Sequence, residues 1–293
     1  MSEIERIGVV GAGQMGAGIA EVCARAGCDV LVVEQDRAAA ESGRARILAS
    51  LDHAVRRGKI GAGEREQAAW RLRFAVDVGE LADRQLVIEA VIEDEPLKCD
   101  VVSQVDKVLT DPEAIVASNT SSIPIMKLAH GAGRPGNVIG LHFFNPVPVM
   151  PLVEVISSLT TSPRVREQAE SFLTRTLGKR TIRAADRSGF VVNALLVPYL
   201  LAAVRMVETG RATPADVDSG MEAGCAHPMG PLRLADLIGL DTVVAIAESM
   251  YAEDREPLFA PPPLLRRMVQ AGHLGRKTGR GFHAYPEASG VPA

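Results

Sequence analysis

The chain has 293 residues, a formal net charge of −4 at pH 7 and 47% hydrophobic residues. This length predicts two domains, and the apolar content is ample for buried cores, which excludes an intrinsically disordered chain. Because there is no basic excess and only 4% of the residues are aromatic, the composition argues against a nucleic-acid partner.

The N-terminus lacks the apolar core of a signal peptide, and the longest apolar stretch, 191–207, is interrupted by Asn193, Pro198 and Arg205. We therefore expect a soluble, cytoplasmic protein with no membrane partner. Its cysteines form no Cys-x-x-Cys pair and are interpreted as small apolar fillers: Cys23, Cys28, Cys99 and Cys225. No His/Cys/Asp spacing indicates a metal site.

The first elements predict a nucleotide-binding unit. The apolar run 6–11 predicts a buried parallel strand, residues 13–26 a helix that stops at Gly27, and residues 29–34 a second buried strand. Together they have about the length of the βαβ unit of dinucleotide folds.

The following residues predict a projecting pair of helices and then more strands. Helices are expected at 37–57 and 62–70, separated by a glycine-containing break. Strands are expected at 72–75, 85–90, 114–117, 137–142 and 152–156, with helices at 96–109 and 164–177. This alternation predicts a doubly wound, Rossmann-like sheet.

Beyond residues 186–189 the pattern becomes almost entirely helical. Helices are expected at 191–209, 213–223, 231–252 and 262–271. We therefore predict an α/β domain over residues 1–187, followed by an all-α domain over residues 188–293.

The first turn carries the signature G-x-G-x-x-G in the context that it requires, after a strand and at the start of a helix. Gly11 permits the tight turn, Gly13 allows the backbone to approach a pyrophosphate, and Gly16 allows close helix packing. The helix N-terminus offers amides and partial positive charge to that anion. The block runs Gly11-Ala12-Gly13-Gln14-Met15-Gly16.

Glu34 ends the second predicted strand, where it can bind the hydroxyls of an adenosine ribose. A carboxylate there would repel a 2′-phosphate, so NAD is favoured over NADP. The neighbouring Gln35 leaves NADP open.

A histidine and a carboxylate follow on successive apolar runs. His142 stands at the end of one run, and Glu154 lies inside the next, twelve positions later. If the runs are neighbouring strands, Glu154 can accept the Nδ1 proton of His142 and leave the other ring nitrogen as a base. The alternative is a core histidine that caps a strand. A base beside a nicotinamide would suit the oxidation of an alcohol.

Taken together, these residues resemble the short-chain L-3-hydroxyacyl-CoA dehydrogenase family over essentially the whole chain. The resemblance rests on blocks at 11–16, 88–94, 117–122, 140–147, 186–193, 227–231 and 275–282. It implies NAD-dependent, reversible oxidation of an (S)-3-hydroxyacyl-CoA, such as the 3-hydroxybutyryl thioester, to the 3-ketoacyl-CoA. It also implies a homodimer formed through the helical domain and a place in fatty acid metabolism.

The resemblance further implies catalytic roles. His142 is similar to the family's general base, and Glu154 to the carboxylate that orients it. Ser121 and Asn193 are similar to residues that contact substrate oxygens, and Ser121 is also expected near the nicotinamide.

Other family positions imply binding roles. Glu93, Lys98 and Asn145 are similar to cofactor contacts, and Asn145 is also compatible with a substrate contact. Ser50 and Arg57, in the predicted helical pair, are similar to positions that hold the CoA moiety. Arginine at 57 keeps the charge that lysine gives to many relatives.

Several alternatives remain at the level of sequence. The same chemistry could act on a hydroxyacyl group carried by an acyl carrier protein, or the chain could be a non-catalytic NAD-binding protein of the same fold. The segment 275–281 is either an anion site or a structural turn. The remaining histidines are expected to be solvated or in turns: His53, His130, His227, His273 and His283.

Overall fold

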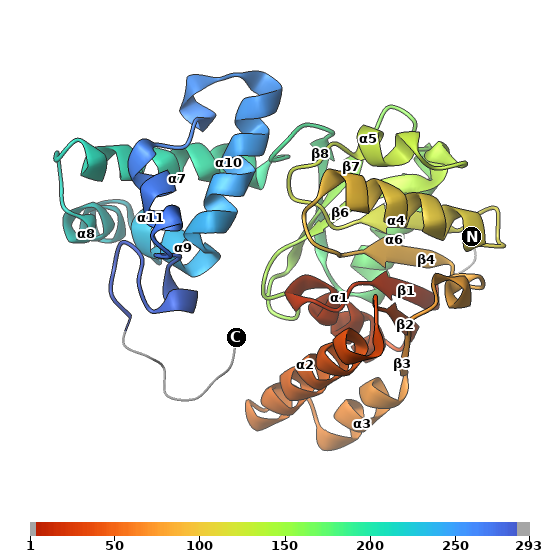
Figure 1. Ribbon diagram of the computed structural model, residues 1–293. Helices are drawn as coiled ribbons and strands as arrows, with labels where there is room; N and C mark the ends of the chain where they lie inside the picture. Colours follow the sequence, from red (N-terminus) through yellow and green to blue (C-terminus); the bar gives the residue numbers. More distant parts are fainter. Residues whose placement is uncertain (1–3, 286–293) are drawn as a thin grey trace. The chain divides into compact units, whose positions relative to one another are not determined.

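The computed structural model describes residues 4–285, which form two compact units that divide between Arg187 and Ser188. The first unit is an eight-stranded sheet of order β3-β2-β1-β4-β5-β6-β7-β8 with helices on both faces (Figure 1). Its strands are β1 (Arg6–Val10), β2 (Asp29–Val33), β3 (Leu72–Ala75), β4 (Leu86–Glu89), β5 (Ile115–Ser118), β6 (Val138–Phe143), β7 (Leu152–Ser157) and β8 (Arg180–Ala185). The predicted Rossmann-like architecture is confirmed.

The strand order creates the place for a ligand. Strands β1 to β6 are parallel, β7 is antiparallel to β6, and β8 is parallel to β7. The order reverses between β1 and β4, and in open α/β sheets ligands bind at the carboxyl ends of the strands at such a point. Apolar runs in the central strands are buried on both faces, as flanking helices require.

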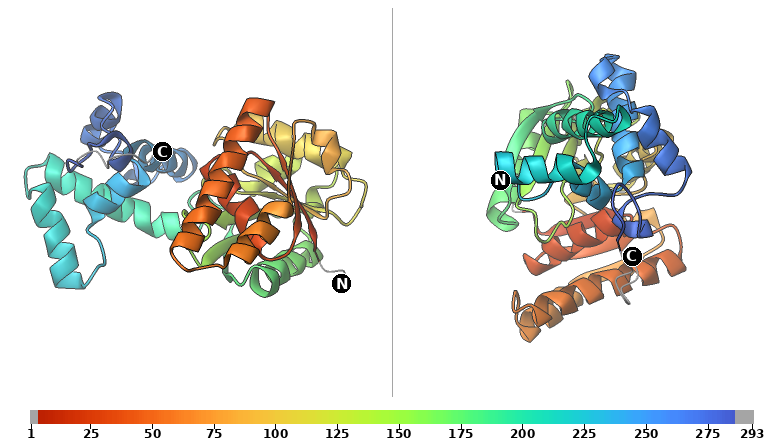
Figure 2. Two further views of the ribbon diagram at one scale, coloured as in Figure 1. Left: turned by 90° about the horizontal axis from the view of Figure 1, so that it is seen from below. Right: turned by 90° about the vertical axis from the view of Figure 1, so that its left-hand side faces the viewer.

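The helices of the first unit are α1 (Gln14–Arg25), α2 (Arg37–Arg56), α3 (Ala62–Trp70), α4 (Glu95–Val108), α5 (Ile125–His130) and α6 (Pro163–Ser171). Helices α2 and α3 form the expected pair and pack against the β3 edge of the sheet (Figures 1 and 2). Asp36 caps the N-terminus of α2 by accepting a hydrogen bond from the Ala39 N–H.

Two elements of this unit were not predicted. Strand β8 has a single neighbour, and its side chains are exposed or half-buried, so it lacks the apolar run that marked the other strands. Helix α5 has six residues, too few to show a helical period, and His130 ends it instead of lying in a loop. Helix α6 is also shorter than predicted, because a π-helical turn follows at Phe172–Thr176.

The helical unit contains α7 (Val192–Glu208), α8 (Pro214–Cys225), α9 (Pro231–Ile238), α10 (Leu240–Asp254) and α11 (Pro263–Gln270). The single helix predicted over 231–252 is wrong, because the chain breaks at Gly239 with a φ of 103°. Only glycine adopts this backbone conformation readily, so α9 ends before Gly239 and α10 begins after it.

The glycine-rich segment near the C-terminus is a structural turn. Asp236 on α9 accepts hydrogen bonds from the Phe282 and His283 amides and from the Tyr285 hydroxyl. A Cβ at Gly281 would lie 1.9 Å from the Asp236 carboxylate, so the close approach requires glycine. An anion site is therefore not needed to explain these glycines.

His283 lies in a bend outside the helices, as predicted, but it is also paired. Its Nε2 lies 2.7 Å from the carboxylate of Asp218, a fully buried residue of α8. This pair fastens the C-terminal segment to the helical unit.

Over residues 4–285, no helix is both long and apolar enough to cross a membrane. The cytoplasmic location stays a prediction.

Candidate active site

The glycine-rich turn at the end of β1 fits a pyrophosphate. Gly11 has a φ of 90°, and a Cβ at Gly16 would lie 1.8 Å from the Gly11 carbonyl oxygen, so neither position tolerates a side chain. A Cβ at Gly13 would meet no atom within 4 Å, so this side of the turn is open. Helix α1 has no side-chain cap and no acidic residue in its first turn. Its first amides are thus available to an anion.

Glu34 lies beside this turn, just beyond β2. One carboxylate oxygen accepts a hydrogen bond from the Ala12 N–H, and the other accepts one from the Gln35 N–H at 3.2 Å. The carboxylate is therefore held at the turn, at the end of the second strand, where dinucleotide folds contact ribose hydroxyls.

His142 and Glu154 form a buried pair across the antiparallel strands β6 and β7. The two residues are register partners, and His142 Nδ1 lies 2.7 Å from Glu154 Oε2. Glu154 is fully buried, and His142 is 7% exposed and contacts the ring of Phe144. The contact expected from the sequence is present. A carboxylate that accepts the Nδ1 proton leaves Nε2 to exchange protons with a substrate.

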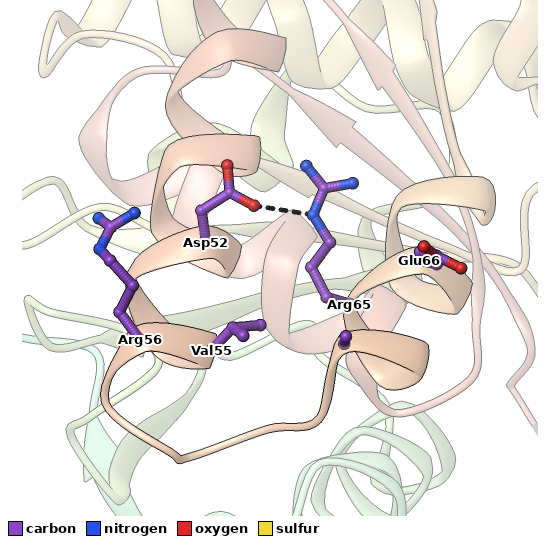
Figure 3. Close-up of a pocket in the computed structure, with 6 residues that line it drawn as sticks. Asp52, Val55, Arg56, Arg65 and Glu66 are labelled. Carbon is purple, nitrogen blue, oxygen red and sulfur yellow. Dashed lines mark hydrogen bonds and ion pairs between the residues drawn. The ribbon is translucent and has the colours of Figure 1, made fainter.

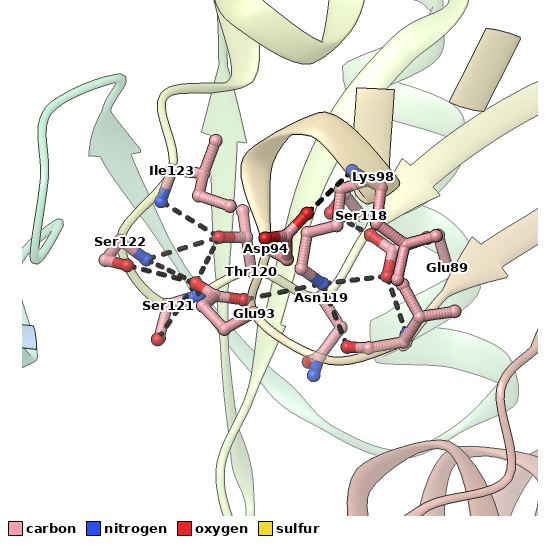
Figure 4. Close-up of polar contacts among 12 residues, drawn as sticks. Glu89, Glu93, Asp94, Lys98, Ser118, Asn119, Thr120, Ser121, Ser122 and Ile123 are labelled. Atoms are coloured by element: carbon pink, nitrogen blue, oxygen red, sulfur yellow. Dashed lines mark hydrogen bonds and ion pairs between the residues drawn. The ribbon is translucent and has the colours of Figure 1, made fainter. Parts of the chain in front are cut away.

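The loop after β5 is organised by one carboxylate from the loop after β4. Oε1 of Glu93 accepts hydrogen bonds from the Ser121 amide at 2.9 Å, the Ser122 hydroxyl at 3.0 Å and the Thr120 hydroxyl at 2.6 Å (Figure 4). The Ser121 hydroxyl also lies within reach of this oxygen, at 3.2 Å. The predicted site residues Ser121 and Glu93 are thus brought together.

Asn119 connects this loop to the strand that carries the histidine. Its side-chain oxygen accepts a hydrogen bond from the Phe143 amide at 2.9 Å, one residue beyond His142. The ends of β5 and β6 are therefore fixed relative to each other by a side chain that sequence reasoning did not select.

Lys98 is buried in an ion-pair network beneath the loop. Its ammonium lies 2.7 Å from Glu89 and 3.4 Å from Glu93, and it donates to the Val91 carbonyl at 3.3 Å (Figure 4). The other oxygen of Glu89 accepts from the Ser118 hydroxyl. Glu89 was missed by sequence reasoning. The signal was a carboxylate inside an apolar strand, which requires a buried cation as its partner.

The network also lowers the pKa of the Glu93 carboxyl. Burial opposes ionisation of this group, but the Lys98 ammonium and the hydrogen bonds from residues 120–122 outweigh burial and hold the pKa below its usual value. The anion is the form that can accept all of these hydrogen bonds.

This lowered pKa predicts a pH-dependent stability. The stabilisation by ionised Glu93 is fully present above the unfolded value of about 4.3 and is lost as the pH falls through the lower folded value. The difference in free energy of unfolding between wild type and Glu93→Gln should stay constant from about pH 7 to about pH 5 and shrink below about pH 4. Urea unfolding across this range measures it, and a difference that grows on acidification would contradict the assignment.

The remaining predicted residues occupy several elements. Asn145 is exposed and precedes the cis proline Pro146, three residues after His142. Ser50 is half-buried on α2, and Arg57 is exposed at its C-terminal end. Asn193 belongs to the helical unit, where it is buried in the first turn of α7.

A hollow of about 350 Å³ lies between α2 and α3, lined by Asp52, Val55, Arg56, Ala62, Arg65 and Glu66 (Figure 3). Neither Ser50 nor Arg57 lines it. Because Arg65 is paired with Asp52 at 2.8 Å, the hollow has no excess positive charge that would select a phosphate.

One sheet thus carries both a dinucleotide turn and a histidine that can exchange a proton, the combination used by nicotinamide-dependent dehydrogenases. The model of the 3-hydroxyacyl-CoA dehydrogenase NAD-binding domain matches residues 6–187, and that of the C-terminal domain matches residues 189–285. The chain therefore belongs to the 3-hydroxyacyl-CoA dehydrogenase family, and NAD is its cofactor.

Individual relatives agree with this placement. The chain is 58% identical to a 3-hydroxybutyryl-CoA dehydrogenase of Mycobacterium tuberculosis, over 96% of this chain and 99% of the relative. A crystal structure of M. tuberculosis FadB2 superposes with a TM-score of 0.96 at 57% identity, covering 97% of this chain and all of that one. The (S)-3-hydroxybutyryl-CoA dehydrogenase of Ralstonia eutropha gives a TM-score of 0.92 at 43% identity, with the same coverage.

Proposed function

We propose that the protein catalyses the NAD-dependent, reversible oxidation of (S)-3-hydroxybutyryl-CoA to acetoacetyl-CoA. The observation that carries the proposal is the buried His142–Glu154 pair on the same sheet as the glycine-rich turn. The names of the bacterial relatives support a four-carbon acyl group. A role in fatty acid metabolism is part of the proposal.

His142 acts as the base in this proposal. Nε2 removes the proton of the substrate 3-hydroxyl as hydride leaves C3, and it returns the proton when the ketone is reduced. NAD, when bound, accepts the hydride. Glu154 keeps the proton of the neutral ring on Nδ1 and stabilises the imidazolium that forms. Ser121 and Asn193 donate hydrogen bonds to substrate oxygen.

The cofactor is held at the carboxyl ends of the strands. The turn residues Gly11, Gly13, Gln14, Met15 and Gly16 receive the pyrophosphate, and Glu34 receives the adenosine ribose. Asn145 and Ser121 contact the nicotinamide half of the cofactor. The Lys98 ammonium is buried against the carboxylates of Glu89 and Glu93. We therefore propose that Lys98 acts on cofactor binding indirectly, by holding Glu93 in position.

The direct test is NADH consumption with acetoacetyl-CoA. We expect rapid turnover and much slower turnover with NADPH, because Glu34 disfavours a 2′-phosphate. A protein that binds NADH tightly but turns over neither acetoacetyl-CoA nor longer 3-ketoacyl-CoA thioesters would instead favour a non-catalytic role.

The carrier is tested at Arg57. If Arg57 and Ser50 hold the phosphorylated end of CoA, Arg57→Ala should raise KM for acetoacetyl-CoA about tenfold, the effect of one charge-assisted hydrogen bond. KM for acetoacetyl-pantetheine, which lacks the nucleotide, should change little. Arg56→Ala, one residue earlier, is the matched control. Equal KM values for all three proteins would favour an acyl carrier protein as the carrier.

The helical unit is proposed to bind substrate and to form a homodimer through α7. This helix exposes large apolar side chains, with Leu195 75% and Met206 42% exposed. Exposed apolar patches of this kind mark protein interfaces. Leu195→Glu should halve the mass measured by light scattering, whereas Leu159→Glu, at a leucine 98% exposed in the first unit, should not. A monomeric wild type would contradict the proposal.

A further inference from the structure

Arg46 contacts the glycine-rich turn directly, although it comes from α2. Its guanidinium donates a hydrogen bond to the Ala12 carbonyl at 2.6 Å. One turn earlier, Gly43 lets the helix approach the same residue, because a Cβ there would lie 2.3 Å from the Ala12 Cβ. The middle of α2 thus packs directly against the glycine-rich turn. No motif or spacing distinguishes Arg46 from the other charged side chains of this polar helix.

Both polar groups of Ala12 are therefore engaged by charged side chains. Its N–H donates to Glu34, and its C=O accepts from Arg46. In a planar trans peptide the C=O and the following N–H point in opposite directions. The contact with Arg46 consequently fixes the direction of the Gly13 N–H. Gly13 is the N-cap of α1 and faces open space.

The contact also places a permanent positive charge beside the turn. A guanidinium has five N–H donors and stays ionised at all ordinary pH values. The Ala12 carbonyl engages one of its nitrogens, and the side chain as a whole is exposed, so other donors can face an anion. The amides of α1 offer only partial charges to a pyrophosphate, whereas Arg46 adds a full one.

We propose that Arg46 is a cofactor-binding residue. It holds the Ala12–Gly13 peptide in the orientation that receives the pyrophosphate, and it attracts the negative charge of the dinucleotide. Through Arg46, the helical pair proposed to hold CoA also takes part in binding NAD.

The test compares Arg46→Ala with Arg44→Ala, which removes the same charge from the same exposed helix two residues earlier. Calorimetric titration with ADP-ribose reports the adenosine diphosphate half of the cofactor without turnover. Arg46→Ala should raise its Kd about tenfold, as expected for one hydrogen bond to a charged group. Adenosine, which lacks the phosphates, should bind both variants equally.

Arg46→Lys keeps the charge and separates the two effects. It should recover part of the ADP-ribose affinity, and its Kd should rise more steeply with salt than that of Arg46→Ala. A lysine variant as weak as the alanine variant would overturn the electrostatic part of the proposal. Thermal unfolding should show that all variants are folded.

Two results would overturn the proposal as a whole. One is an unchanged Kd for ADP-ribose in folded Arg46→Ala. The other is a raised KM for acetoacetyl-CoA without any change in ADP-ribose binding, which would assign Arg46 to the substrate carrier. The ADP-ribose Kd is measured without turnover, so the first result is independent of whether acetoacetyl-CoA is the true substrate.

Discussion

Replacement of His142 by Gln should lower kcat for acetoacetyl-CoA reduction about a thousandfold, because it removes the group that exchanges the proton in the reaction. General acid–base catalysis by one side chain contributes about 10²- to 10⁴-fold to a rate. A thousandfold loss lies in the middle of that range, as expected for a histidine whose Nδ1 is oriented by a fully buried carboxylate at 2.7 Å. Steady-state kinetics at saturating NADH gives the value.

The control for this prediction is His130→Gln, at an exposed histidine at the end of α5, which should keep wild-type kcat. The Kd for NADH should be almost unchanged in His142→Gln, because the glycine-rich turn lies on other strands of the sheet. A kcat within tenfold of the wild type would show that another group carries the proton.

The glycine-rich turn and the His142–Glu154 pair could be predicted because each depends on residues that are close together in the sequence. The glycine turn lies between two strands that are close in sequence, and its glycines are required by contacts such as the approach of Gly16 to Gly11. The His142–Glu154 contact follows from two successive strands, since register partners on neighbouring strands must meet. In each case the local sequence determines which groups face one another.

Other features depend on partners that are distant in sequence. The carboxylate of Glu93 is surrounded by residues 120–122, and Arg46 reaches back to Ala12, 34 positions earlier. No periodicity or motif reports such contacts, because each side chain alone is compatible with a solvated surface. Strand β8 was missed for a related reason, since an edge strand needs no continuous apolar run.

The break at Gly239 shows the limit of periodicity more directly. The apolar pattern continues through 231–252, so the sequence favours one helix. Tertiary contacts decide otherwise, because the Leu240 amide bonds to the Leu274 carbonyl and Lys277 pairs with Asp241. Contacts with the C-terminal segment thus override the continuous apolar pattern, and the chain forms α9 and α10 instead of one helix.

Replacement of Glu154 by Gln should lower kcat by roughly a hundred- to ten-thousandfold while leaving the fold intact. Gln has nearly the same volume, so no cavity forms at this fully buried position. Its amide lacks the negative charge that stabilises the imidazolium, and its NH₂ group can donate to Nδ1. In that arrangement the proton of the neutral ring resides on Nε2, which is then unable to accept one from the substrate. Because an enzyme leaves the equilibrium constant unchanged, activity must fall in both directions.

Two further variants distinguish the effect of the Glu154 charge on His142 from the effect of Glu154 on packing. Glu154→Gln should unfold at close to the wild-type temperature and bind NADH normally, and Glu113→Gln, at an exposed carboxylate, should be fully active. Glu154→Ala should in addition lose stability, because it removes buried atoms and a hydrogen-bond partner of His142. A Gln variant with wild-type kcat would mean that the charge of Glu154 has no part in catalysis. His142 would then act with a ring that other contacts orient.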